Sequence, residues 1–399
     1  MLSDLDRQKL SEVMSDGEAE KELRAFYELG GIDVPKSIDP VTAAALYPDT
    51  GSVTRFEEFF NCPYLFFLGK GIKPDDEKTP DMRANEEGDF IHNMLDRFFK
   101  RAKEKASNIR DMSMADIADI TDSIAKELAE ESPKELDDGD SLALVSELKS
   151  EVDEYLGFLK QEKSVSVSDV ELTEQKYDME LGGSRLTGRI DRVDTCVVNG
   201  QRYFSVTDYK TGKTKDFTLY DIYKGLMLQV AVYLAAAGKL MPDAKPAGAG
   251  YVHIDPSGAL EDKEKEISFP AKGLHIDDQD VIKAMYGLKE DEAKKVPGLG
   301  IRVKNDGKLY KAGADKLLSE ADMDLIKRFA AHKVREASDK IKEGVIAAEP
   351  ARKRDGSYPC RYCRFNGICP NPLEDNSERN VDSKEELLSK MAEEVADDE

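Results

Sequence analysis

The strongest constraint on the fold of this chain is a pair of strand-like segments separated by a turn signal. The segments span residues 188–194 and 204–210, and the dipeptide Asn199-Gly200 lies between them. Asn-Gly is typical of the two-residue turn that joins antiparallel strands, because both residues accept positive φ angles. We therefore expect a β-hairpin, in which successive side chains alternate between the two faces.

This hairpin would gather three charged side chains in one place. Asp208 and Lys210 lie two residues apart, so they share a face, and pairing of the strands brings Asp191 beside Asp208. Two carboxylates, with the backbone carbonyl of Tyr209 as a third oxygen, suit a hard divalent cation. Lys210 could orient a water molecule and stabilise developing charge. The pattern predicts metal-dependent cleavage of a phosphodiester.

Each of these charged side chains also has a simpler explanation. Asp191 and Asp208 could be surface acids paired with Arg189 and Arg192, and Lys210 could be a solvated lysine at a strand end. Both acids, however, lie in segments whose apolar positions are typical of a buried core. Because two neighbouring carboxylates repel each other, a site built from them favours a bound cation.

Two further groups could complete a metal site. His92 lies at the edge of the apolar stripe of a predicted helix at 86–104, where it could supply a nitrogen ligand; a histidine on the helix surface is the alternative. Glu171 and Glu174 lie on the strand that precedes the hairpin, and either could reach the site. Of these two acids we favour Glu174.

A helix after the hairpin carries two polar side chains on one face. Gln229 and Tyr233 are four residues apart in a predicted helix at 218–238. They could contact the backbone of DNA or the lysine of the site, and simple helix packing is the alternative explanation.

One apparent motif is excluded. Gly212-Lys213-Thr214 resembles the end of a phosphate-binding loop, but that motif requires a glycine where Thr207 stands. The chain therefore has no ATP site of this type.

Three of the five cysteines fall close together near the end of the chain. They form the pattern Cys360-x2-Cys363-x5-Cys369, whereas Cys62 lies far earlier and Cys196 falls in a predicted strand, where a small buried side chain is expected. Clustered thiols in a cytoplasmic chain favour a metal centre over disulfides, and flanking bases favour thiolates. Spacing alone leaves zinc and a [4Fe–4S] cluster open. A centre that includes Cys62 would act as a structural buckle.

The charge of the chain limits how it could bind nucleic acid. The 399 residues carry a formal net charge of −23, which argues against DNA binding over the whole surface. Residues 111–163 contribute −11 (16 acids, 5 bases) and residues 371–399 contribute −8 (11 acids, 3 bases), which leaves −4 for the rest. This distribution allows a local basic groove, or a partner that supplies one.

The periodicities predict an α/β chain of two or three structural units. We expect helices at 1–50 (one or two), from Ser52 or Thr54 to Asn61, and at 86–104, 115–162, 218–238 and much of 277–343. We expect strands at 165–181, 185–198, 201–211 and 248–254, a loop at 73–85, and an acidic disordered tail after Pro370. No apolar run approaches the roughly 18 residues of a membrane span, and no secretory signal is visible, so we expect a cytoplasmic location.

Several motifs occur together in one order, and as a set they resemble a known family. The ordered motifs are Ser52-Val53-Thr54-Arg55-Phe56-Glu57, Cys62-Pro63-Tyr64-Leu65-Phe66-Phe67, Gly88-x3-His92, Gly188-Arg189-Ile190-Asp191-Arg192-Val193-Asp194, Asp208-Tyr209-Lys210, Gln229-x3-Tyr233 and the terminal cysteine pattern. From about residue 50 to 370, the chain resembles the C-terminal nuclease domain of the AddB subunit of AddAB-type ATP-dependent helicase–nucleases. That domain is in the RecB-like branch of the PD-(D/E)XK nucleases.

The resemblance implies a fold, cofactors and roles for residues. It implies a restriction-endonuclease-like mixed β-sheet flanked by helices and closed by a [4Fe–4S] buckle. It implies Mg²⁺ as the catalytic metal and Lys210 as the catalytic lysine, with Gln229 and Tyr233 completing the helical motif of the family. The implied metal ligands are His92, Asp191, Asp208 and the Tyr209 carbonyl, and the implied cluster ligands are Cys62, Cys360, Cys363 and Cys369.

The resemblance also implies a biological setting. The expected activity is exonucleolytic trimming of DNA during double-strand-break repair and recombination, in a heterodimer with an AddA-type helicase–nuclease subunit. Residues 1–50 would then be the helical remnant of an upstream helicase-like region, residues 51–370 the nuclease domain and residues 371–399 the disordered tail. The alternatives are a stand-alone single-strand exonuclease of the CRISPR-associated or exonuclease V type, and a non-catalytic iron–sulfur module that binds DNA ends.

Overall fold

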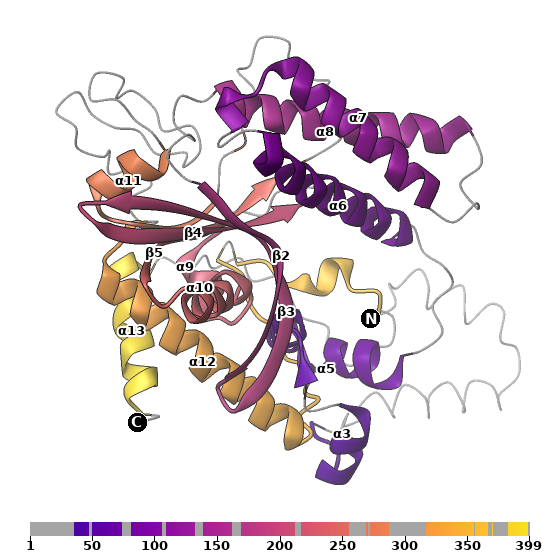
Figure 1. Ribbon diagram of the computed structural model, residues 1–399. Coiled ribbons are helices and arrows are strands. Elements are labelled where there is room, and N and C mark those ends of the chain that lie inside the picture. The colour runs from indigo at the N-terminus through magenta and orange to yellow at the C-terminus, as the bar shows by residue number, and fades with distance from the viewer. Residues whose placement is uncertain are drawn as a thin grey trace, which may run out of the picture.

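A mixed seven-stranded β-sheet forms the centre of the computed structural model (Figure 1). The structure describes residues 36–47, 50–73, 81–105, 109–131, 139–161, 169–211, 217–254, 269, 272–286, 317–354, 356–365, 369 and 382–397. The strands are β1 (Thr50–Gly51), β2 (Asp169–Leu181), β3 (Ser184–Val198), β4 (Gln201–Lys210), β5 (Ala244–His253), β6 (Lys272–Ile276) and β7 (Leu317–Leu318). The four strands expected from the sequence are therefore confirmed as β2 to β5.

The long strand β3 joins β1 and β2 to the rest of the sheet. It pairs antiparallel with β2 along most of its length, and antiparallel with β4 over its second half. The order then continues through β5, β6 and β7, while the short β1 runs parallel to the start of β3. Parallel pairs (β4 with β5, β6 with β7) and antiparallel pairs occur together, as expected for a mixed sheet.

The predicted hairpin is confirmed by its turn and its register. Asn199 and Gly200 have φ angles of 50° and 80°, which is the backbone that a two-residue Asn-Gly turn requires. The paired residues run from Val198 and Gln201 at the turn to Arg192 and Thr207. This register places Asp191 and Asp208 immediately beyond the last pair, at the end of the hairpin that is distant from the turn.

Helices cover both faces of the sheet (Figure 1). The helices are α3 (Pro40–Leu46), α4 (Val53–Asn61), α5 (Pro63–Phe66), α6 (Asp81–Lys105), α7 (Met114–Glu131), α8 (Gly139–Gln161), α9 (Leu219–Tyr223), α10 (Gln229–Leu240), α11 (Gln279–Tyr286), α12 (Glu320–Lys342) and α13 (Lys384–Ala396). A π-helical segment follows α5 (Phe67–Ile72), and short 3-10 turns span Ile109–Asp111 and Pro359–Tyr362.

Two apolar cores result from this layering. Helices α4, α10, α12 and α13 share one core with the inner face of β3 and β4, where Ile190 and Phe204 are buried. Helices α6, α7 and α8 form a second core that reaches the sheet through Tyr209, Val252 and Ile254. Residues near the ends of β4 and β5 therefore lie between the two helical layers, and the charged cluster is in this part of the sheet.

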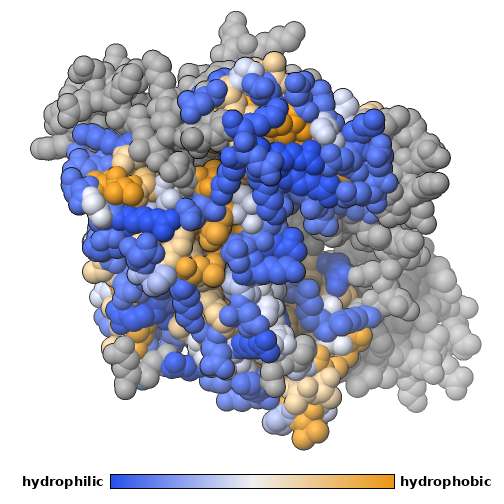
Figure 2. Space-filling view, viewed as in Figure 1, coloured by the Kyte–Doolittle hydropathy of each residue, from blue (hydrophilic) through white to orange (hydrophobic). Residues whose placement is uncertain are grey.

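The acidic segment predicted at 115–162 forms the outer helices α7 and α8. Several of its acids point outward, since the side chains of Asp116, Asp122 and Glu131 are 47%, 68% and 57% exposed, whereas Glu151 is buried. Figure 2 shows a largely hydrophilic surface over these helices. The negative charge of this segment is therefore concentrated on one outer layer.

Three expectations from the sequence are wrong. The loop expected at 73–85 is shorter, because α6 already begins at Asp81. The helix predicted at 218–238 is divided into α9 and α10, because Gly225 adopts a φ of 74° in a turn between them. The tail after Pro370 is not disordered throughout, because α13 packs against α12 and α9 and buries Leu387, Met391 and Val395. Residues 1–35 and 370–381 lie outside the described part of the chain.

In the part of the chain that the structure describes, no helix combines the length and the apolar character needed to cross a membrane.

Candidate active site

Strand β4 presents an acid and a lysine that contact each other. Lys210 Nζ lies 2.5 Å from Oδ2 of Asp208, whose side chain is only 4% exposed. Burial raises the pKa of Asp208 to about 7; Lys210 opposes this rise and Asp191 adds to it. The alternation predicted for β4 is thus observed, and Asp208 is a carboxylate that is costly to keep charged without a nearby cation.

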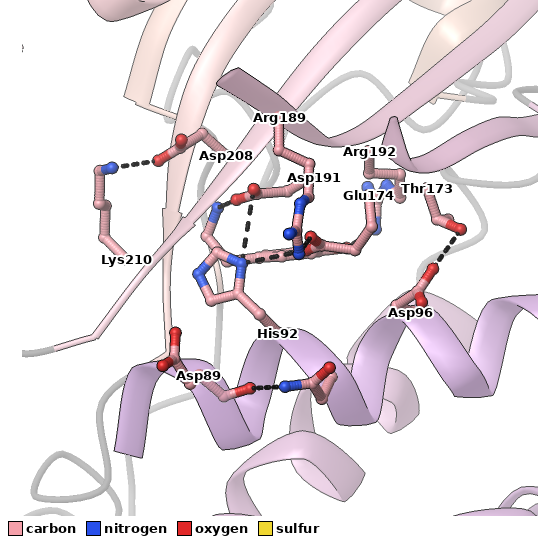
Figure 3. A network of polar contacts seen from close by, with 12 residues as sticks. Asp89, His92, Asp96, Thr173, Glu174, Arg189, Asp191, Arg192, Asp208 and Lys210 are labelled. Atoms are coloured by element: carbon pink, nitrogen blue, oxygen red, sulfur yellow. Dashed lines mark hydrogen bonds and ion pairs between the residues drawn. The ribbon is translucent and has the colours of Figure 1, made fainter. Parts of the chain in front are cut away.

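Asp191, on β3, is held by the backbone of β4. The N–H of Tyr209 donates a hydrogen bond to Oδ2 of Asp191 at 2.7 Å, in a buried environment. The other carboxylate oxygen, Oδ1, lies 3.4 Å from Nδ1 of His92 (Figure 3). The backbone contact fixes Asp191 relative to the strand that carries Asp208 and Lys210.

His92, on α6, lies between two carboxylates. Its Nδ1 is 3.3 Å from Oε1 of Glu174 and 3.4 Å from Oδ1 of Asp191 (Figure 3). Burial alone would lower the pKa of His92, but these two carboxylates raise it to about 10. Their negative potential therefore holds a positive charge strongly, which is the electrostatic property that a cation site needs.

Glu174, rather than Glu171, reaches the site. Its carboxylate contacts His92 and accepts a hydrogen bond from Nη1 of Arg189 at 2.8 Å, whereas Glu171 pairs with Arg202 at the same distance. Glu174 has a φ of 45°, a left-handed conformation that is uncommon for residues other than glycine. Such strain persists where the surroundings require it, and here it directs the side chain of a β2 residue toward His92.

These groups fit a hard divalent cation. Among the described residues, ligand atoms of His92, Glu174 and Asp191 lie within 4.8 Å of one another. Carboxylate oxygens with an imidazole nitrogen are a donor set for Mg²⁺ or Mn²⁺ rather than for soft metals. Asp208 lies beside this set, and its Oδ2 contacts Lys210.

The first turn of α10 supports the lysine. Lys210 Nζ donates a hydrogen bond to Oε1 of Gln229 at 3.0 Å, and Nε2 of Gln229 donates to the hydroxyl of Tyr233 at 2.7 Å. The shared face expected for Gln229 and Tyr233 is therefore present, and it points at Lys210. The ring of Tyr251, 5.1 Å from Lys210 Nζ, adds a cation–π contact.

Glu57 is a neighbour of the site to which the sequence analysis gave no role. Its Oε1 accepts a hydrogen bond from the N–H of Gln229 at 2.8 Å. Burial raises the pKa of Glu57 to about 7, although this hydrogen bond and Lys210 oppose the rise. The available signal was an acid that directly follows Phe56 in a helix with three phenylalanines, but its partner lies 172 residues away in the sequence.

The four predicted cysteine ligands surround one pocket. Cys62, Cys360, Cys363 and Cys369 line it together with apolar side chains that include Leu65 and Phe365. Burial raises the pKa of Cys62, and the neighbouring thiols Cys360 and Cys369 add to this rise. Cys196 stays apart in β3, where burial raises the pKa of its thiol to about 11. The pocket thus gathers soft ligands of the kind that bind zinc or iron.

Comparison with known proteins agrees with this geometry. A family model described as the PD-(D/E)XK nuclease superfamily matches residues 50–370, which include both sites. The chain belongs to this superfamily. It is therefore a hydrolase of the nuclease class. The name of the PD-(D/E)XK superfamily describes an acid followed later by Asp or Glu, any residue and Lys; Asp191 and Asp208-Tyr209-Lys210 fit that description, with Ile190 in place of proline.

Relatives of this PD-(D/E)XK chain are larger proteins. It is 28% identical over 396 residues to a Clostridium perfringens protein named as the B subunit of an ATP-dependent helicase/deoxyribonuclease, covering 89% of this chain and 33% of that protein. A Desulforamulus reducens protein of the same name is also 28% identical, covering 92% of this chain and 34% of the relative. The chain therefore spans about a third of their length. A solved structure from Eubacterium rectale aligns at 13% identity with a TM-score of 0.36, covering 82% of this chain and 91% of that one.

Proposed function

We propose that the chain is a Mg²⁺-dependent deoxyribonuclease that hydrolyses phosphodiester bonds from DNA ends. The observation that carries this proposal is that two groups of charged side chains meet at one end of the hairpin. The cation-attracting group of His92, Glu174 and Asp191 lies beside the contacting pair of Asp208 and Lys210. A metal site adjoining an oriented ammonium group is the arrangement that attack by water on a phosphate needs.

The proposed reaction assigns a separate role to each charged residue. Asp191, Asp208, His92 and the carbonyl of Tyr209 would hold Mg²⁺, and Glu174 would hold His92 or join it as a ligand. Bound there, Mg²⁺ lowers the pKa of water and neutralises phosphate charge. Lys210, held between Asp208 and Gln229, points its ammonium group at the reacting centre and stabilises negative charge as it develops.

Gln229 and Tyr233 would act through the lysine. Because the amide of Gln229 donates to Tyr233 and accepts from Lys210, its orientation is fixed from both sides. A fixed amide keeps the ammonium group from rotating toward solvent, which preserves the geometry that catalysis requires.

The names of the relatives support a setting in DNA repair and recombination. Each of those proteins is called the B subunit of a helicase/deoxyribonuclease, which implies a second, different subunit. We propose that this chain likewise works on DNA with a helicase–nuclease partner that delivers the strand. Its formal net charge of −23 favours this arrangement, because a partner can supply the basic surface that long DNA contacts need.

We further propose that the four-cysteine pocket holds a [4Fe–4S] cluster. Four cysteines line the pocket, and most of its other lining side chains are apolar. Four thiolates are the usual ligands of a [4Fe–4S] cluster.

The nuclease proposal is tested by Asp208→Asn. Asp243→Asn is the matched control, because Asp243 is 64% exposed and pairs only with Arg202 among the ion pairs of the described residues. With Mg²⁺ and linear DNA, we expect D208N to lose more than about 100-fold in cleavage rate and D243N to match the wild type. D208N should fold normally, since burial already raises the pKa of Asp208 to about 7 and the amide removes that cost. Cleavage by D208N at the wild-type rate would contradict the proposal, and DNA binding without cleavage by the wild type would favour a non-catalytic role.

A further inference from the structure

The N-terminus of α10 receives its cap from another helix. Leu228 occupies the N-cap position and provides no side-chain hydrogen bond. The first N–H groups of a helix need acceptors, and a negative charge there is also favoured by the helix dipole. Glu57 of α4 supplies such an acceptor, because its Oε1 accepts a hydrogen bond from the N–H of Gln229 at 2.8 Å. Glu57 is therefore a side-chain cap at the start of α10.

The same helix also holds the turn that leads into α10. Gly225 lies so close to Phe60 that a Cβ atom at this position would be 2.3 Å from the ring. Phe60 follows Glu57 by three residues, so both contacts come from one side of α4. Two separate contacts, one polar and one apolar, thus attach α4 to the start of α10.

The start of α10 is where the lysine is held. Gln229, whose N–H binds Glu57, accepts a hydrogen bond from Lys210 Nζ at 3.0 Å through its side chain. Lys210 in turn lies 2.5 Å from Asp208. A displacement of the α10 N-terminus would therefore move the acceptor of Lys210 directly.

The C-terminal end of α4 reaches the cysteine pocket. The helix ends at Asn61, and the next residue, Cys62, lines the pocket with the three later cysteines. The carbonyl of Asn61 accepts a hydrogen bond from the N–H of Ala351, in the segment that leads to those cysteines. One helix of nine residues thus connects the cysteine pocket with the first turn of α10.

We infer that Glu57 is a positioning residue for Lys210, and that α4 makes the position of this lysine depend on an intact four-cysteine centre. Glu57 contacts the backbone of α10 and not the reacting groups, so its effect passes through Gln229. The inference rests on the proposed nuclease function, and it adds to that function the route by which a distant centre controls the active site.

The role of Glu57 is tested by three variants and a control. Glu57→Ala and Glu57→Leu remove the acceptor, Glu57→Gln keeps an acceptor oxygen without the charge, and Glu58→Gln alters a neighbouring acid that pairs with Lys70 on the surface. We expect E57A and E57L to lower kcat about 10- to 100-fold, the usual effect of losing a supporting contact. Their KM for DNA should stay within about twofold, because substrate contacts are unchanged. E57Q should fall between these variants and the wild type, and E58Q should match the wild type.

Hydrogen exchange supplies a readout that does not need activity. In protein without Mg²⁺ but with the cysteine centre intact, the amides of 228–231 should exchange faster in E57A or E57L than in the wild type. The amides of α7 should exchange at an unchanged rate. E57L fills the space of the side chain, so it decides the question if E57A does not fold. Unchanged exchange at these amides, together with an unchanged kcat, would overturn the role of Glu57.

The link to the cysteine centre is tested with Cys369→Ser, which removes a ligand without altering α4. Cys196→Ala is its control, since Cys196 lies outside the pocket. We expect faster exchange at 228–231 and a lower kcat in C369S, and neither change in C196A. Unchanged exchange at 228–231 in C369S would overturn the link. If the wild type itself does not cleave DNA, the proposed function fails, and the exchange measurements alone then decide this inference.

Discussion

The backbone N–H of Tyr209 donates a hydrogen bond to Oδ2 of Asp191 at 2.7 Å. This contact joins the acid of β3 to the strand that carries Asp208 and Lys210, so the groups cannot shift independently. The other oxygen of Asp191 faces His92 on α6. A single carboxylate therefore connects the sheet to the helical layer that supplies the histidine, and the geometry of the candidate site depends on the packing of both.

Replacement of Lys210 by methionine should abolish cleavage while leaving the metal site in place. Methionine keeps the length of the side chain but loses the ammonium group, so we expect a fall in kcat of about 100-fold or more. Binding of Mg²⁺, measured by calorimetry, should persist, because His92, Glu174 and Asp191 are untouched. The matched control is Lys245→Met, since Lys245 is an exposed lysine paired with Glu320. Equal rates for K210M and K245M would show that Lys210 has no catalytic role.

Local patterns in the sequence were enough to predict the hairpin site. The alternation of Asp208 and Lys210, and the turn at Asn199-Gly200, depend on residues close together in the chain, and the register follows from them. Glu174 could only be favoured, because its approach to His92 depends on a φ of 45° that no periodicity predicts.

The role of Glu57 depends on a distant contact, and the apolar pattern of the helix α13 is concealed by its acidic composition. Glu57 could not be assigned, because its partner is 172 residues away in the sequence. Composition predicts a disordered tail where α13 forms, because acids dominate this segment. Two features of the sequence indicate this helix. Leu387, Met391 and Val395 are spaced four residues apart, and Ser383 and Glu386 form a capping box.

Loss of pocket cysteines should remove the metal centre, whereas loss of Cys196 should not. We expect Cys62→Ser and Cys363→Ser to lower iron per chain and absorbance near 400 nm in anaerobically purified protein, because each removes one of four thiolate ligands. Cys196→Ala should retain both, since Cys196 is buried in β3 away from the pocket. Stoichiometric zinc and no iron in the wild type would contradict the proposed cluster.

Arg192 should be essential for stability. It is 5% exposed, lies 3.0 Å from Asp194, and donates to the hydroxyls of Tyr155 and Tyr209 at 2.8 and 2.9 Å. Arg192→Met would leave buried polar groups with one partner fewer, so we expect a loss of about 3–5 kcal/mol in the free energy of unfolding. Arg185→Met, at an exposed pair with Asp178, should change it far less, because exposed ion pairs contribute little to stability. Urea unfolding would measure both, and equal effects would show that the buried network is dispensable.

The helix α13 should contribute to the core despite its acidic composition. Met391 is 0% exposed, so Met391→Ala should lower the free energy of unfolding by about 2–5 kcal/mol through the cavity it leaves. Ser389→Ala, exposed on the same helix, should change it by less than about 0.5 kcal/mol. Thermal or urea unfolding would compare the two variants. Equal stability of M391A and S389A would mean that α13 does not pack against the domain in solution.

The buried carboxyl of Glu57 should make the folded protein less stable as pH rises. Burial raises its pKa from an ordinary value of 4.5 to about 7. Between these values the folded protein keeps a proton that the unfolded chain has released, so folding is progressively disfavoured as pH rises from about 4.5 to 7. Glu57→Gln cannot titrate, so it lacks this contribution. The free energy of unfolding of E57Q, minus that of the wild type, should therefore increase across this interval and level off above it. Urea unfolding of metal-free protein at several pH values would measure the difference, and a flat or falling difference would contradict the raised pKa.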